Sequence, residues 1–94
     1  MRNGILVMTK YRHAEGLTLN QMGDDALLAR ESDGEVIGLN SVCARVWSLL
    51  EEPKDLSAIV EVLLKEFEVE RETCEQQVGA LLEQMREQGL IVPQ

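Results

Sequence analysis

The side chains that could do chemistry on their own are few: one histidine, His13, and two cysteines, Cys43 and Cys74. The cysteines lie 31 residues apart and form no Cys-x-x-Cys pair, whereas a zinc site needs more ligands at closer spacing. His13 lies in a polar stretch with no context for a catalytic triad. The seven glycines are scattered and form no phosphate-binding loop. We therefore expect no catalysis, no metal and no other cofactor, and two buried thiols.

The charge of the chain argues against a nucleic-acid partner. The formal net charge is −8, and residues 31–94 carry fourteen acidic but only five basic side chains. Such a surface repels phosphate, whereas a DNA-binding helix is normally basic. Only three aromatic residues are present, too few for stacking on single-stranded nucleic acid. The acidity suits a basic partner peptide instead.

The 94 residues are long enough for one domain, 1–94. The apolar run Ile5-Leu6-Val7-Met8 is too short for a secretory signal, and no run approaches the length of a membrane span. We expect a cytoplasmic protein that does not bind membranes and keeps its thiols reduced.

The first half of the chain predicts a small sheet over residues 15–39. Leu17–Met22 alternates apolar and polar residues, as in a half-buried strand, and 26–30 is a second strand candidate. Asp33-Gly34 is typical of a type I′ hairpin turn and predicts that Glu35–Leu39 returns as a third strand. Residues 1–14 form an N-terminal arm or an extra strand, and residues 1–10 are a candidate contact for a weak homodimer.

Three helices are predicted over residues 40–92. Asn40 or Ser41 caps the first, Asp55 the second, and Glu70 begins the third, which Gly89 ends. Trp47 is expected to anchor the core between helix and sheet. The pattern predicts an α+β fold, a winged helix-turn-helix in which a three-stranded antiparallel sheet precedes three helices.

An open sheet edge next to a helix is the most promising binding surface in this layout. The third strand, with Gly38 permitting close approach, offers backbone groups on which an extended peptide can add as a further strand. On the third helix, Cys74, Val78 and Met85 share one meridian, and Gln77, Leu81, Gln84 and Gln88 share a flank. The simpler interpretation is that the apolar stripe is core and that the glutamines are solvated.

The order of several residues resembles the PqqD-like family, also called RiPP precursor recognition elements. The similarity spans roughly residues 15–92 and rests on a set of short segments: Gly34-Glu35-Val36-Ile37-Gly38-Leu39-Asn40, Val46-Trp47, Leu49-Leu50, Ile59, Val78, Leu81-Leu82, Met85 and Gly89-Leu90-Ile91.

The resemblance implies a non-catalytic adaptor. Such a protein binds the leader peptide of a ribosomally made precursor and presents it to a leader peptidase, as in lasso-peptide pathways, or to a radical SAM enzyme. The implied peptide-binding residues are Glu35, Val36, Ile37, Gly38 and Leu39 on the third strand, and Cys74, Gln77, Val78, Leu81 and Gln84 on the third helix. The third strand has no aromatic residue, which lasso-peptide members often carry there, so the pathway stays open.

Two other functions fit the same layout. A winged-helix DNA-binding regulator would need a basic third helix, and the many glutamates of residues 70–87 argue against it. A dimerisation module without peptide binding would use Ile5–Met8 to pair across a two-fold axis.

Overall fold

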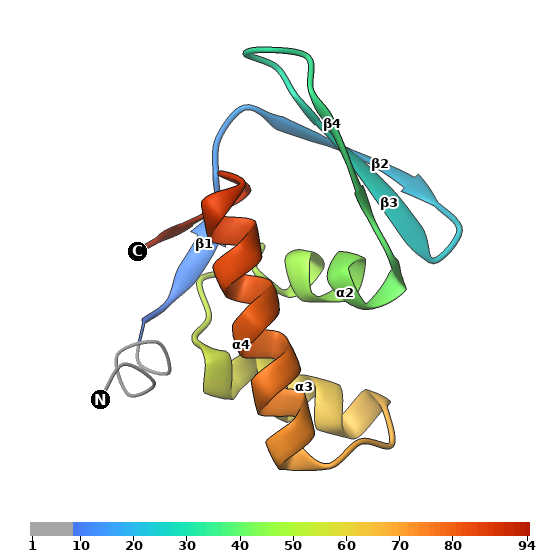
Figure 1. The fold of residues 1–94 in the computed structure, drawn as a ribbon, viewed down its shortest axis with the longest axis vertical. Helices are drawn as coiled ribbons and strands as arrows, with labels where there is room; N and C mark the ends of the chain where they lie inside the picture. Colours follow the sequence, from blue (N-terminus) through green and yellow to red (C-terminus); the bar gives the residue numbers. More distant parts are fainter. Residues whose placement is uncertain (1–8) are drawn as a thin grey trace.

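A computed structural model of the protein describes residues 9–94. The elements, in chain order, are β1 (Tyr11–His13), β2 (Leu17–Met22), β3 (Asp25–Arg30), β4 (Val36–Leu39), α2 (Ser41–Leu49), α3 (Leu56–Glu66), α4 (Arg71–Glu87) and β5 (Ile91–Pro93). Figure 1 shows the sheet of β2, β3 and β4 above the three helices. The α+β class, with a three-stranded antiparallel sheet followed by three helices, is confirmed. The winged helix-turn-helix arrangement stays a prediction.

The sheet has the order β2-β3-β4, so β2 and β4 are its two edges among the described strands. Met22 pairs with Asp25 across a two-residue loop in which Gly23 has a φ of 65°. The prediction of a type I′ turn at Asp33-Gly34 is wrong. The loop is longer, because the Arg30 N–H bonds to the Glu35 carbonyl at 2.8 Å, and only Gly34 takes a positive φ, of 73°. A type I′ turn needs positive φ at both central residues.

A second, two-stranded sheet joins the two ends of the described chain. Tyr11 of β1 pairs with Pro93 of β5, and His13 pairs with Ile91. The last helix ends at Glu87, and β5 (Ile91–Pro93) begins inside the stretch 40–92 that was expected to hold the three helices. The extra-strand alternative for residues 1–14 holds for Tyr11–His13, whereas Ile5–Met8 lies outside the described residues.

The helix ends follow from capping chemistry. The Asn40 side chain accepts a hydrogen bond from the Cys43 N–H, and the Asp55 side chain accepts one from the Ala58 N–H, each at 2.9 Å. Glu70 precedes α4 without a side-chain cap. Gly89, with a φ of 77°, ends α4 and lets the chain turn into β5.

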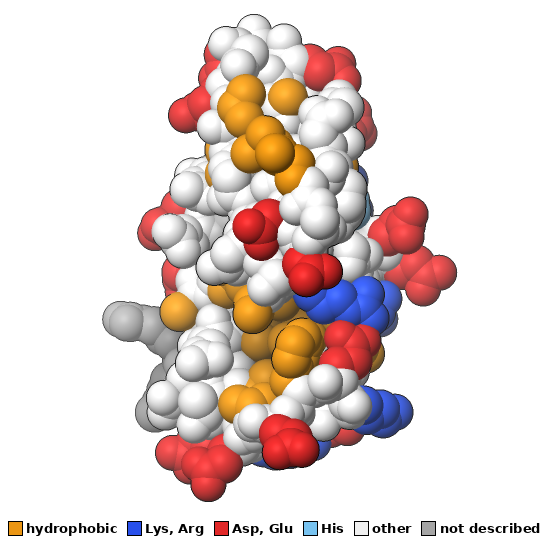
Figure 2. Space-filling view, turned by 90° about the vertical axis from the view of Figure 1, so that its right-hand side faces the viewer, with side chains coloured by type: hydrophobic (Ala, Val, Ile, Leu, Met, Phe, Trp, Pro, Cys, Tyr) orange, Lys and Arg blue, Asp and Glu red, His pale blue; other side chains and the backbone are white. Residues whose placement is uncertain are grey.

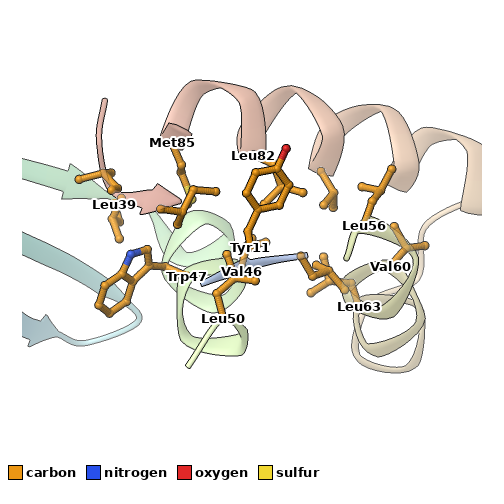
Figure 3. Close-up of a cluster of buried hydrophobic side chains, with 14 of the residues drawn as sticks. Tyr11, Leu39, Val46, Trp47, Leu50, Leu56, Val60, Leu63, Leu82 and Met85 are labelled. Carbon is orange, nitrogen blue, oxygen red and sulfur yellow. The ribbon is translucent and has the colours of Figure 1, made fainter. Parts of the chain in front are cut away.

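The core lies where the three helices meet the inner face of the sheet. Leu82 and Met85 of α4 point towards Val46 and Leu50 of α2 (Figure 3). Trp47 is 7% exposed, so its prediction as a core anchor is confirmed. Cys74 is buried as expected, but Cys43 is only half-buried. Burial raises the pKa of both thiols.

An open sheet edge beside a charge-free helix flank

β4 presents one row of backbone groups that no described residue uses. Because the Arg30 N–H bonds to the Glu35 carbonyl, the alternation of an antiparallel ladder makes Leu28–Ile37 a hydrogen-bonded pair and Ala29–Val36 a non-hydrogen-bonded pair. The N–H and C=O of Ile37 therefore face β3. Those of Val36 and Gly38 face outward, at the free edge.

The side chains of β4 alternate between two faces. Ile37 and Leu39 point to the core side, where Leu39 is buried and Ile37 half-buried. Val36 is 58% exposed on the outer face. A Cβ added to Gly38 would meet only Leu27 Cδ2, at 3.8 Å, so the backbone next to this glycine is open to a neighbour.

The helix residues predicted to bind a peptide divide into two groups. Cys74 and Val78 are 3% and 2% exposed, so their side chains belong to the core and do not form an open groove wall. Leu81 is half-buried and packs against that core, whereas Gln77 and Gln84 are exposed. Cys74 and Val78 are therefore core residues, and the neighbouring flank with Gln77 and Gln84 is the accessible surface of α4.

Charge divides α4 lengthwise. At about 100° per residue, its charged side chains all fall on one half of the helix. They are Arg71, Glu72, Glu75, Glu83, Arg86 and Glu87. The flank opposite carries Thr73, Gln77, Ala80, Leu81 and Gln84, followed by the C-cap Gln88. Arg71, at the N-terminal end of the charged half, pairs with Glu61 of α3. The uncharged flank lies on the other half of the helix.

Arg30 connects the sheet to the end of α4. Its guanidinium donates to Glu35 Oε1 at 2.7 Å and, from the other nitrogen, to the Gln88 carbonyl. Asp33 lies 3.5 Å away, and the Glu35 backbone N–H bonded to its carboxylate, together with Arg30, lowers the Asp33 pKa. The Glu35 carboxylate is thus engaged by Arg30. This cluster fixes how far β4 and the C-terminal end of α4 lie apart.

Two features of the site had no sequence signal. His13 stacks on Trp47 with ring centroids 3.5 Å apart, and His13 Nε2 lies 2.5 Å from the Trp47 carbonyl oxygen. The indole Nε1 of Trp47 has no hydrogen-bond partner among the described residues. The second is the Arg30 bridge, which joins residues 58 positions apart in the chain. Both contacts arise only from tertiary packing.

The described part of the chain, residues 9–94, contains no cluster of three or more His, Cys, Asp or Glu side chains arranged to hold a metal ion. Within the same residues, none of the helices has the length and hydropathy needed to cross a bilayer.

The described residues form a small α+β domain in which β4 is one edge of the three-stranded sheet. Residues 13–91 match the family described as coenzyme PQQ synthesis protein D, PqqD, and the chain belongs to this family. Comparison with curated protein sequences gives no match.

Two solved structures are similar to this chain. One is described as TbiB1 in complex with the TbiA(beta) leader peptide, with a TM-score of 0.78 and 29% identity over 85% of this chain and 93% of that one. The other is a lasso peptide synthetase B1 complexed with the leader peptide, with a TM-score of 0.77 and 25% identity over 88% and 98% of the two chains.

Proposed function

We propose that this protein is a non-catalytic adaptor that binds the leader peptide of a ribosomally synthesised precursor. The leader adds as a fourth strand to β4 and lies against the uncharged flank of α4. Its backbone pairs with the outward N–H and C=O groups of Val36 and Gly38. Ile37, Leu81, Gln77 and Gln84 line the space that its side chains enter.

The observation that carries the proposal is the free edge of β4 beside a helix flank without charge. A peptide that lies between them buries no unpaired charge, which would otherwise cost several kcal/mol. The glutamines offer neutral donors and acceptors to its backbone or side chains. The two similar structures are both complexes with leader peptides, which supports the same occupant here.

The adaptor role includes delivery to a partner enzyme. A leader peptidase of a lasso-peptide pathway is the preferred partner, because the second similar structure is a lasso peptide synthetase B1. A radical SAM enzyme is the alternative, in keeping with the PqqD family.

Cys74 and Val78, as core residues of α4, support the peptide-binding surface from the inside.

The test is fluorescence anisotropy with labelled leader peptides of precursors encoded near this protein. We expect saturable binding to one of them. Leu81→Glu, which places a charge on the neutral flank, should weaken binding at least about ten-fold, because desolvating an unpaired carboxylate costs more than about 1.4 kcal/mol. Glu75→Gln, on the charged half of α4, is the matched control and should not change affinity. Equal losses in both variants, or no binding by any leader, would contradict the proposal.

A further inference from the structure

β2, at the opposite edge of the sheet, also has backbone groups that no residue of 9–94 uses, and they belong to residues that line a pocket. Since Thr18–Ala29 and Asn20–Leu27 are the hydrogen-bonded pairs of β2 and β3, the N–H and C=O groups of Leu19 and Gln21 point outward. The side chains of these two residues point to the face of the sheet that covers α2.

That face encloses a pocket of about 490 Å³ between β2, α2 and the end of α3. Its lining residues are Leu19, Gln21, Asp24, Ala26, Ser41, Ala44, Arg45, Ser48 and Phe67. Figure 2 shows this side of the molecule, with apolar side chains in a hollow next to basic and acidic ones. Leu19 is 39% and Phe67 46% exposed, so two large apolar side chains lie open to water here. Its volume is in the range of ligand pockets.

The free edge and the pocket fit the same occupant. A strand added antiparallel to β2 places the side chain opposite Leu19 on the same face as Leu19, which is the pocket face. An apolar residue at that position would cover Leu19 and Phe67. The Arg45 guanidinium donates from its Nε to Glu66 at 2.9 Å, so its positive charge is balanced by a carboxylate where it lines the pocket.

Charge selects the kind of strand. Glu15 precedes β2, and Asp24 and Asp25 follow it. In a symmetric antiparallel pairing of two copies through β2, Glu15 of one copy would lie opposite Asp25 of the other when the pairing is centred on Asn20. When it is centred on Leu19, Glu15 would lie opposite Gly23, next to Asp24. Like charges placed opposite each other are destabilising, and each copy already carries −8. A strand with basic residues at both ends would be attracted instead.

We infer that β2 and this pocket form a second strand-addition site, which binds a basic extended segment of a partner protein with an apolar residue at its centre. The site lies at the sheet edge opposite β4, so it does not depend on leader binding. Both edges can be occupied at once, because β3 separates them.

The test uses a synthetic peptide, KRTVTFTVRK, and a neutral analogue in which glutamine replaces each basic residue. Amide shifts of the ¹⁵N-labelled protein should move at Leu19, Gln21 and Phe67. The neutral peptide should bind at least about three-fold more weakly at about 50 mM salt. Shifts confined to Val36 and Gly38, equal binding of the two peptides, or no shifts at about 1 mM peptide would each overturn the inference.

Matched variants separate the two edges. Gln21→Pro removes an outward N–H and should weaken the basic peptide by about two- to ten-fold relative to Gln21→Thr. Val36→Pro, at the other edge, should leave its affinity unchanged. Asp24→Asn, which leaves the backbone intact, should also weaken it. Equal binding by Gln21→Pro and Gln21→Thr would count against strand addition, provided that both spectra stay dispersed.

Discussion

Val36→Pro tests whether the leader pairs with the backbone of β4. Proline removes the Val36 N–H, which points to the free edge, and leaves the hydrogen bonds of Ile37 to β3 in place. Edge strands tolerate proline where the missing N–H faces solvent. The Val36 side chain is 58% exposed, so little packing is lost. We expect a folded domain with a reduced affinity for the leader.

The size of the effect follows from one hydrogen bond. Its loss costs about 0.5–1.5 kcal/mol, which is about two- to thirteen-fold in Kd. Val36→Ala keeps the N–H and should bind with nearly wild-type affinity. Ile37→Pro removes a bond to β3 and should lower the melting temperature instead. Isothermal titration calorimetry with the leader and thermal unfolding of all three variants separate these effects. Equal affinity of Val36→Pro and Val36→Ala would refute backbone pairing at this edge.

Three further outcomes are expected. Leu82→Ala, at a fully buried position, should lower the free energy of unfolding by about 2–5 kcal/mol in urea titrations, whereas the exposed Gln84→Ala should change it by less than about 0.5 kcal/mol. Burial raises the pKa of Cys43 and Cys74, so both should react with iodoacetamide more slowly at pH 7.5 than after unfolding, with Cys74 the slower of the two by mass spectrometry. The hydrogen bond from Arg45 lowers the folded-state pKa of Glu66, so this pair stabilises the fold above the unfolded pKa of Glu66, and the contribution disappears as the pH falls through the folded value. Glu66→Gln should remove the part of the acid dependence of the melting temperature that comes from this pair. For a partly exposed pair, that part corresponds to less than about 1 kcal/mol in the free energy of unfolding.

Local patterns predicted the parts of the fold that local physics determines. The alternation of Leu17–Met22 and the caps at Asn40 and Asp55 each act within a few residues, and the structure has a strand and two helix starts there. β5 is only three residues long and exists through its pairing with β1, some 80 positions earlier, so no local pattern could indicate it. The type of the turn after β3 was predicted wrongly, because Asp33-Gly34 belongs to a four-residue loop.

The candidate site was predicted only in part for a similar reason. Helical periodicity places Cys74 and Leu81 near one another, but it cannot say which of them the other helices cover. Packing decides that Cys74 is core and that Leu81 stays partly open. The outward direction of the Val36 and Gly38 amides depends on the register with β3, which the sequence leaves undetermined.

The pairing of β1 with β5 has a practical meaning for tethering. The Gln94 N–H donates a hydrogen bond of 2.8 Å to the Lys10 carbonyl, so these two residues lie side by side. In Figure 1 that place lies across α4 from β4. An enzyme fused after Gln94 would leave the β4 edge clear, and a flexible linker would hold its catalytic centre at a millimolar effective concentration near a bound peptide. A fused pair of this kind could then tolerate a weak contact between adaptor and enzyme.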